Sequence, residues 1–381
     1  MSPAEKVIEF RRALHQIPEV GLDLPMTRAY LWLRLTGLGL KPVECAEGLY
    51  VDLGTEGPLF AWRADMDALP IQEELVSDFI SGTPGKMHAC GHDAHMAIAL
   101  GIAQHYTTYG HLLPCRLRII FQPGEEGHRG AKRMIEAGVL EGVQAISGLH
   151  IGSIFDSLPL GSFGTCNRET MAACSLFSIT YYGNSGHGSK PPASNALLAA
   201  CDFASGWKEA GGKPVSGYDQ IVSIGSIHSG DAPNVIPGSA TLTGSIRAAN
   251  QRDLERLCDY VKDYAKGITW RAKNYGTTVD VQINHVISPV VNNSNMVEIL
   301  KSAVEEREKF HIFRDPTLGG EDFGEYQKHV PGVFFFLRTS APGKPPQHHP
   351  RFEVEESLLY RAIPVVDRLL QKWAHSLRPK E

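Results

Sequence analysis

The sequence lacks the features that mark several classes of protein. It has no run of basic residues and its net charge is −5, so it offers a phosphate backbone little to bind. No segment approaches the roughly 18 consecutive apolar residues of a membrane span. The opening stretch "MSPAEKVIEFRRALHQ" reads as an amphipathic helix without the apolar run of a signal peptide. We therefore expect a cytoplasmic protein that binds neither nucleic acid nor membranes.

Paired cysteines are missing as well. The seven cysteines are scattered along the chain, an odd number that fits free thiols in a reducing compartment better than a disulfide framework. Internal repeats and low-complexity segments are absent, and 43% hydrophobic residues is an ordinary globular composition. At 381 residues, the chain is long enough for two domains.

The hydrophobic pattern predicts two domains, one inserted in the other. Short apolar runs, "PLFAWRAD", "CRLRIIFQ" and "VQAISGLHI", alternate with helical patterns, which is typical of an open, mostly parallel α/β sheet. From about residue 169 the pattern reads β-α-β-β-α-β, the ferredoxin-like α+β unit. We predict a catalytic α/β domain over residues 1–168 and 286–381. The inserted lid or dimerisation domain would cover residues 169–285.

Polar residues follow three of the predicted strands. Asp65 and Asp67 come after the first, Glu125 and Glu126 after the second, and His150 near the end of the third. Ligands of open α/β sheets bind beyond the carboxyl ends of the strands. We therefore expect these side chains to share one rim of the sheet.

The stretch "MHACGHDAH" adds Cys90 and His92 at the start of an apolar helix. Taken alone, such residues are more often structural, and a lone cysteine is usually a small hydrophobic residue. With an acid from the "GEE" turn they form a mixed sulfur, nitrogen and oxygen set, which suits an open catalytic site for zinc or a similar ion. One glutamate would coordinate and the other would take a proton from water. Their positions leave open which does which.

A series of motifs gives the chain a specific resemblance to a known family. The motifs are "FRRALHQIPEVG", "RADMDALP", "MHACGHDAH", "FQPGEEGHRGAKRMIEAGV", "GLHIG", "GHGSKPP", "NVIPG", "GGEDFG" and "HHPRF". Together they resemble the co-catalytic metallo-amidohydrolases of the aminoacylase and carboxypeptidase G2 family. The most similar branch contains hippurate hydrolase, auxin-conjugate hydrolases and N-acetyldiaminopimelate deacetylase. The resemblance runs in order over nearly the whole chain.

The resemblance implies two divalent ions in each subunit. The implied ligands are Cys90, which would bridge the ions, His92, Glu126, His150 and His348. His348 is favoured over its neighbour His349 because the family ligand stands in His-x-Pro. Glu125 would be the general base, and Asp67 would lie beside the ions. Zinc, manganese, cobalt and nickel all accept such ligands.

Three residues of the inserted domain also match the family. The resemblance implies that His187 enters the site of a partner subunit and stabilises the oxyanion, and so it implies a homodimer. Asn234 and Arg247 would bind the α-carboxylate of the substrate. From the residues alone, a surface charge at Arg247 and a turn-shaping role for Asn234 are the alternatives. The chain departs from many relatives at Pro192, where they have a second histidine.

We therefore predict a metal-dependent amidohydrolase that cleaves an N-acyl-amino acid into a carboxylate and a free amino acid. One alternative is a dipeptidase or carboxypeptidase that uses the same residues. Another is a catalytically inactive dimeric binding protein, against which the intact Glu125 and the five ligand candidates speak. The remaining histidines near the motifs are predicted to be structural or to orient ligands. They are His15, His88, His95 and His128.

Overall fold

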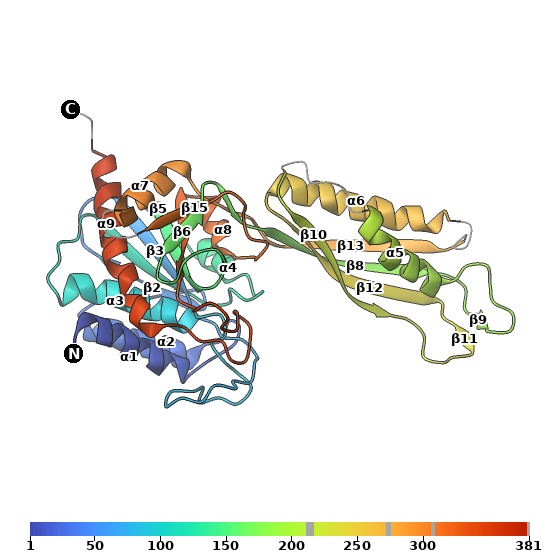
Figure 1. Cartoon of the computed structure of the whole chain (residues 1–381), viewed down its shortest axis with the longest axis horizontal. Coiled ribbons are helices and arrows are strands. Elements are labelled where there is room, and N and C mark those ends of the chain that lie inside the picture. The colour runs from blue at the N-terminus through green and yellow to red at the C-terminus, as the bar shows by residue number, and fades with distance from the viewer. Residues whose placement is uncertain (211–216, 272–275, 306–308, 379–381) are drawn as a thin grey trace. The chain divides into compact units, whose positions relative to one another are not determined.

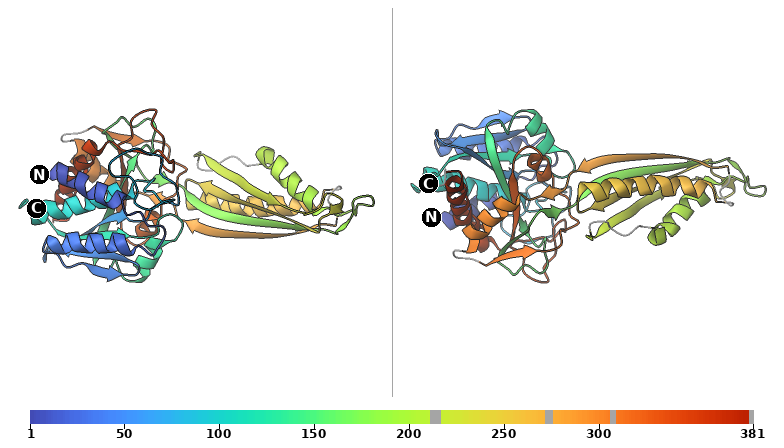
Figure 2. Two further views of the ribbon diagram at one scale, coloured as in Figure 1. Left: turned by 90° about the horizontal axis from the view of Figure 1, so that it is seen from below. Right: turned by 90° about the horizontal axis from the view of Figure 1, so that it is seen from above.

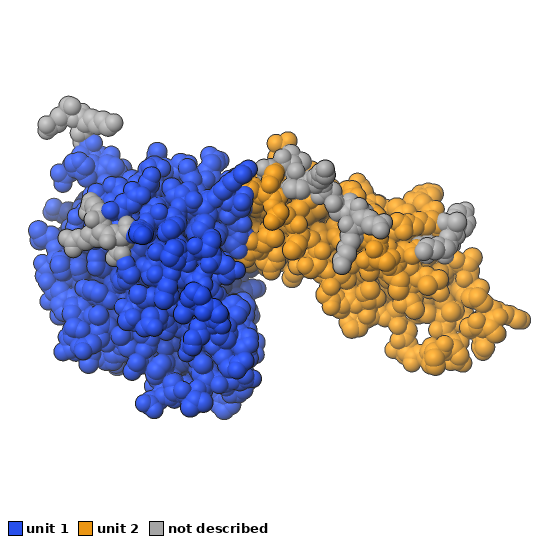
Figure 3. Space-filling model, in the orientation of Figure 1, with its two compact units in different colours: residues 1–170, 290–317, 321–381 blue, residues 171–289, 318–320 orange. Residues whose placement is uncertain are grey.

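The computed structural model describes residues 1–210, 217–271, 276–305 and 309–378. The chain divides into two compact units, which Figure 3 shows in different colours. Unit 1 comprises Met1–Thr170, Val290–Thr317 and Glu321–Glu381, and unit 2 comprises Met171–Pro289 and Leu318–Gly320. The chain passes between the units within a few residues of the predicted boundaries. The assignment of Leu318–Gly320 to unit 2 had no signal in the sequence pattern.

Unit 1 is built on an eight-stranded sheet. In spatial order the strands are β1 (Val43–Cys45), β2 (Gly48–Leu53), β4 (Arg116–Gln122), β3 (Leu59–Asp65), β5 (Val143–Gly152), β16 (Gly332–Arg338), β6 (Phe163–Cys166) and β15 (Phe310–Phe313). The central pairs β4–β3, β3–β5 and β5–β16 are parallel, whereas β1–β2, β2–β4 and β16–β6 are antiparallel. The predicted mostly parallel α/β sheet is confirmed.

Helices pack against this sheet (Figure 1). Those that share the main hydrophobic core with it are α1 (Pro3–His15), α2 (Pro25–Gly37), α3 (His92–Thr107), α7 (Ser294–Glu305) and α9 (Ala362–Ser376), the last preceded by the 3₁₀ helix η2 (Glu356–Arg361). Phe60, Trp62 and Ala64 of β3 belong to this core. Because side chains alternate along a strand, Arg63 and Asp65 face the opposite side. The short helices α4 (Gly130–Glu136) and α8 (Phe323–Gln327) lie near them.

The start of α3 is the element that matters most for the site. Its residues from His92 to Ala103 are all buried, so it is a core helix rather than an amphipathic surface helix. The polar side chains of its first turn therefore have to find partners inside the protein. The N-cap of the helix is Gly91, whose φ of +94° is in the left-handed region that glycine enters without strain.

Unit 2 has the predicted β-α-β-β-α-β order. Its elements are β8 (Ala173–Tyr182), α5 (Ala196–Ala210), β10 (Gln220–His228), β12 (Ser239–Ala248), α6 (Gln251–Thr269) and β13 (Thr278–Ile287). The strands form an antiparallel sheet in the order β10-β12-β8-β13, and both helices pack on it, as the views in Figure 2 show. Asn250 caps α6, because its side chain accepts the N–H of Asp253.

Some details differ from the sequence patterns. The polar segment "DAPNVIPG", whose composition predicts a loop, contains a short strand, β11 (Val235–Ile236), that pairs with β9 (Gly186–His187). A further ladder joins β7 (Glu169–Met171) to β14 (Val290–Val291). The sequence pattern also predicts a helix over residues 294–308. It forms from Ser294 to Glu305, and positions 306–308 lie outside the described residues. None of the helices in the described ranges is long and apolar enough to span a membrane.

Candidate metal centre

The five predicted ligands converge at the carboxyl-end rim of the unit 1 sheet. Cys90, His92 and His150 present donor atoms that lie within 4.8 Å of one another, and so do Cys90, Glu126 and His348. Cys90 belongs to both groups, which is the arrangement that a thiolate bridging two ions requires. Its Sγ lies 3.4 Å from His150 Nε2, and His348 Nε2 lies 3.1 Å from Glu126 Oε1.

A glycine makes room for the first group. Gly91 stands between Cys90 and His92, and a Cβ added to it would lie 2.5 Å from the side chain of Ile151. Its positive φ would also strain any other residue. The close packing of this turn on β5 therefore depends on glycine, and it brings Cys90 next to His150.

The surroundings of His150 suit a neutral ligand. Its Nδ1 donates to the carbonyl of Ile151 at 2.7 Å, which leaves Nε2 to face Cys90. Burial, reinforced by the neighbouring ring of His95, holds the pKa of His150 well below its usual value. A metal-binding histidine needs this neutral form, with the second nitrogen hydrogen-bonded in this way.

The structure distinguishes His348 from His349. His348 adopts a φ of +65°, and its N–H donates to the carbonyl of Ala89 at 2.8 Å, so the loop holds it in a strained conformation beside Cys90. In contrast, His349 Nδ1 accepts the N–H of Arg351 at 3.0 Å. The geometry therefore supports the choice of His348 that the His-x-Pro pattern implied.

The donor atoms fit divalent ions. Both ring nitrogens of His92 are buried and have no hydrogen-bond partner within the described part of the chain. Such atoms are rare in folded proteins, and each costs about 1–3 kcal/mol when left unsatisfied. A cation bound to one of the two nitrogens would satisfy it, and the other nitrogen lies on the side of Asp67, with Nδ1 3.6 Å from Asp67 Oδ1. The mixed thiolate, imidazole and carboxylate set suits zinc and similar ions.

Glu125 lies in a cluster of buried carboxylates. Its oxygens come within 4.8 Å of those of Glu321 and Asp322. Burial, followed by the charges of Glu321 and Glu126, raises the pKa of Glu125 well above its usual value. A carboxyl group with a raised pKa suits a residue that must both accept and return a proton near neutral pH.

Arg63 organises this cluster. Its fully buried guanidinium donates to Gln122 Oε1, to Asp65 Oδ2 and to Asp322 Oδ1 at 2.6–2.8 Å, and lies 2.9 Å from Glu321 Oε1. Sequence reasoning did not assign a role to Arg63, Glu321 or Asp322. Two signals were available: a charged residue inside the apolar run "PLFAWRAD", and the two adjacent acids of "GGEDFG".

The contacts of Asp67 join it to three of the candidate site residues. Its two oxygens accept the backbone N–H groups of Glu125 and Glu126, each at 3.0 Å. Its Oδ1 is also 3.6 Å from His92 Nδ1. Asp67 therefore fixes the turn that presents both glutamates.

The other histidines of these motifs differ in their surroundings. His95 Nδ1 is 2.6 Å from Asp65 Oδ1, and its Nε2 accepts the N–H of Ile151 at 3.0 Å, which agrees with an orienting role. His128 Nδ1 lies 2.8 Å from the carbonyl oxygen of Glu126. His88 is buried, and neither of its ring nitrogens has a hydrogen-bond partner among the described residues.

The three predicted residues of unit 2 fall at two ends of its sheet. His187 and Asn234 share one end, where the N–H of Gly188 donates to the Asn234 carbonyl. His187 Nδ1 accepts the N–H of Ser189 at 3.1 Å, which leaves Nε2 to carry the proton. Arg247 lies near the other end of β12 and donates to the carbonyl of Leu318 at 3.1 Å.

Strand length sets the distance between these ends. From Ser239 to Arg247, β12 extends by about 26 Å at the usual rise per residue. A single copy of unit 2 therefore does not bring Asn234 and Arg247 to one carboxylate, and the predicted pair would need two subunits.

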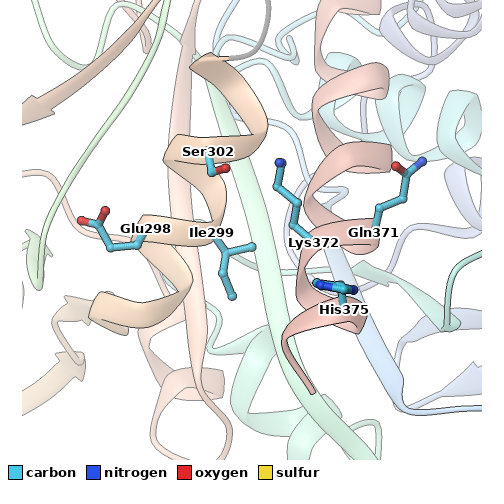
Figure 4. A pocket seen from close by; sticks show the side chains of 6 residues that line it. All are labelled: Glu298, Ile299, Ser302, Gln371, Lys372 and His375. Atoms are coloured by element: carbon cyan, nitrogen blue, oxygen red, sulfur yellow. The ribbon is translucent and has the colours of Figure 1, made fainter. Parts of the chain in front are cut away.

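A separate cavity lies between α7 and α9 in unit 1. It has a volume of about 500 Å³ and is lined by Glu298, Ile299, Ser302, Gln371, Lys372 and His375. Figure 4 shows these side chains on the two helices. None of the candidate ligands lines this cavity, so it is distinct from the metal centre.

Comparison with known proteins gives consistent matches. Residues 61–372 match the sequence model of Peptidase family M20/M25/M40. The chain is 33% identical to N-acetylcysteine deacetylase of Bacillus subtilis over 93% of each protein. It is 35% identical to thermostable carboxypeptidase 2 of Saccharolobus solfataricus over 93% of this chain and 91% of that protein.

A solved structure agrees with these matches. The Bacillus subtilis YXEP protein, described as a dinuclear metal binding peptidase from the M20 family, superposes with a TM-score of 0.85. It is 29% identical in sequence, and the superposition covers 98% of this chain and 99% of that one.

Proposed function

The chain belongs to Peptidase family M20/M25/M40, and from that premise we propose that it is a metal-dependent amidohydrolase acting on N-acyl-amino acids. It would convert them to a carboxylate and a free amino acid. The observation that carries this proposal is the convergence of Cys90 with two sets of donor atoms. The deacetylase relative, by its name, acts on an amino acid whose nitrogen carries an acetyl group.

We infer two divalent ions per subunit, of zinc, manganese, cobalt or nickel. They would be held by Cys90, His92, Glu126, His150 and His348. When bound, the ions would polarise the amide carbonyl and make a water molecule acidic enough to attack at neutral pH.

The protein's own groups then move the proton. Glu125 takes it from the attacking water as the new carbon–oxygen bond forms. It returns the proton to the nitrogen as the carbon–nitrogen bond breaks, so the amine leaves neutral. Asp67 holds the Glu125 backbone in place for both steps.

Unit 2 would supply the contacts to the rest of the substrate. In this proposal Arg247 binds the α-carboxylate, to which a planar guanidinium can donate two hydrogen bonds. His187 and Asn234 would serve the site of the partner subunit in a homodimer, where the His187 Nε2–H donates to the oxyanion. The separation of Asn234 from Arg247 along β12 supports this division between subunits. We also propose a cytoplasmic location, with which seven free thiols agree.

Substrate comparison tests the proposal. The metal-free protein is reloaded with Zn, Mn or Co and assayed on a panel of N-acetyl-amino acids. We expect hydrolysis that disappears on chelation and returns with metal. A protein that binds two ions yet hydrolyses none of the panel would contradict the substrate assignment.

Carboxypeptidase or dipeptidase action is the second candidate, because one relative is named a thermostable carboxypeptidase. Dipeptides with the same C-terminal residue as the N-acetyl-amino acids separate the two. Our proposal expects the higher kcat/KM with the N-acetyl compounds. An equal or higher value with the dipeptides would favour the peptidase.

A further inference from the structure

The motif "FRRALHQIPEVG" has no part in the proposed reaction. It nevertheless contains a buried histidine whose two ring nitrogens both form hydrogen bonds to carboxylates. His15 is 1% exposed, its Nδ1 lies 2.7 Å from Asp93 Oδ2, and its Nε2 lies 3.1 Å from Glu73 Oε1. A neutral imidazole has only one N–H to donate, so both bonds form only with the protonated ring. Burial opposes the charge, but the bonds to Asp93 and Glu73 outweigh it and raise the pKa of His15.

Asp93 connects His15 to one half of the metal centre. Asp93 follows His92 in the first turn of α3. Its Oδ2 also accepts from Arg11 Nε at 2.9 Å, and its Oδ1 accepts the N–H of Ala94 at 2.9 Å. Because the N-cap glycine of α3 has no side chain to bond this turn, the Asp93 carboxylate is what fastens it to α1.

Glu73 connects His15 to the other half. It lies in the long connection between β3 and α3, where its second oxygen accepts the N–H of Ser81 at 2.7 Å and closes the connection on itself. The next residue, Glu74, donates its N–H to the carbonyl of Pro350 at 2.9 Å. Pro350 stands in the same loop as His348, two positions further along the chain.

The residues just after His15 contact the same segments. The carbonyl of Gln16 accepts the N–H of Gly82 at 2.9 Å, in the connection that carries Glu73. The carbonyl of Glu19 accepts the N–H of Ala68 at 2.7 Å, next to Asp67. His15, Gln16 and Glu19 of the motif therefore all contact segments that carry candidate site residues.

We propose that His15 is a positioning residue whose two carboxylate bonds hold the His92 and His348 segments in their relative places. These two histidines belong to different donor groups that share Cys90, so loss of His15 would loosen both ion sites. The inference rests on the proposed metal centre. Buried charged groups are a poor source of stability, because apolar side chains of similar size often do as well. In this proposal, the hydrogen bonds of His15 contribute a fixed distance between the His92 and His348 segments, not stability.

Cobalt(II) binding tests the inference, because its visible spectrum reports the coordination of the ion. Full-length wild-type protein, His15→Gln and Glu73→Gln are stripped of metal and titrated with Co²⁺. We expect both variants to bind Co²⁺ about tenfold or more weakly, as loss of groups that orient ligands usually does. Their Co²⁺ spectra should shift. The double variant should bind no more weakly than His15→Gln, because the two residues act through one bond.

His105→Gln is the matched control. His105 is a buried histidine of α3, the helix that carries His92 and Asp93, and it is 6% exposed. Its carboxylate neighbour Asp367 lies in α9 at 3.9 Å. Its replacement should lower the thermal midpoint while the Co²⁺ affinity stays within about twofold of wild type. If His15 only stabilised the fold, His15→Gln would also lower the thermal midpoint and leave the Co²⁺ affinity unchanged.

Unchanged Co²⁺ affinity and spectra in both test variants would overturn the inference. Should His15→Gln fail to fold, Glu73→Gln decides, since it leaves α1 and its core contacts intact. Failure of the proposed function is a different result, because the wild-type protein itself would then not take up two Co²⁺ or hydrolyse an N-acyl-amino acid.

Discussion

At the scale of single residues, we predict that Cys90 makes metal binding depend on pH. Burial raises the pKa of its thiol to about 12, so the metal-free protein carries a protonated thiol at neutral pH. Because ions bind the thiolate, loading must release this proton, and the apparent affinity must rise with pH. Calorimetry of Zn²⁺ binding in buffers of different ionisation enthalpy measures the proton count.

The matched variants for this prediction are Cys90→Ser and Cys115→Ser. Burial also raises the pKa of Cys115 to about 12, but Cys115 lies outside both donor groups. We expect Cys90→Ser to lose retained metal in elemental analysis and Cys115→Ser to keep it. Unchanged metal content in Cys90→Ser would contradict the bridging role.

Glu125 is predicted to act on the proton and not on the ions. Glu125→Gln keeps the shape of the side chain but cannot accept a proton. We expect kcat to fall by about 10²–10⁴, with the metal content unchanged. Glu136→Gln, at an exposed acid of α4, should keep wild-type activity. Turnover near wild type in Glu125→Gln would remove Glu125 from the mechanism.

His15 should make stability depend on pH in a defined direction. Arg11, Asp93, Glu73 and the ring of His88 surround it. The pKa of His15 is raised from 6.5, so its contribution is complete below pH 6.5 and is lost as pH rises through the higher value of the folded state. Burial raises the pKa of Glu73, but the hydrogen bonds from His15 and from the Ser81 N–H lower it below 4.5. The contribution of the Glu73 carboxylate to stability is therefore complete above pH 4.5.

The difference in thermal midpoint between wild type and His15→Gln should therefore be largest between pH 4.5 and 6.5. It should shrink as pH rises further, as measured by calorimetry of the metal-free proteins. A difference that grows above pH 6.5 would mean that His15 is neutral in the folded protein.

At the scale of elements, the turn between β4 and α4 depends on Gly130. Its N–H donates to the carbonyl of Gly124 at 3.1 Å, which closes the turn that carries Glu125 and Glu126. A Cβ at Gly130 would lie 1.6 Å from the backbone oxygen of Pro123, and backbone cannot yield as a flexible side chain can.

We therefore expect Gly130→Ala to displace both glutamates and to lower metal affinity and turnover together. Gly37→Ala is the control, because a Cβ at the end of α2 meets nothing within 4 Å. It should leave both quantities unchanged in parallel metal titrations and activity assays. Wild-type values for Gly130→Ala would show that the turn tolerates the shift.

How well the elements could be predicted depended on their length and regularity. The strand in "PLFAWRAD" and the apolar helix after His92 were predictable, because a continuous apolar run between polar segments is local information. The pairing of β9 with β11 was not. Each is two residues long, and such a pair forms only because distant segments meet.

At the scale of the whole molecule, the proposed dimer predicts complementation between subunits. His187→Ala and Glu125→Gln should each be inactive alone. If His187 serves the partner's site, a mixed dimer contains one site with both residues intact. Random mixing should then restore about a quarter of wild-type activity, measured after the two variants are co-expressed. No recovery in dimers of confirmed mixed composition would place His187 in the site of its own subunit.

The sequence by itself determined the fold class and the ligand candidates. Both follow from local features of the sequence. Apolar runs and periodic patterns indicate the strands and helices, and Cys90 and His92 stand two residues apart. The acids follow predicted parallel strands, whose carboxyl ends share one rim of the sheet. Only the tertiary structure decided which distant groups meet. Arg63 reaches Glu321 and Asp322, and His15 lies between Asp93 and Glu73.

The same holds for groups that tertiary structure keeps apart. Asn234 and Arg247 are near in sequence, yet they lie towards opposite ends of the unit 2 sheet. The reason is physical: sequence spacing fixes distance only within one regular element, where the rise per residue is constant. Across elements, the distance depends on how the chain turns and packs.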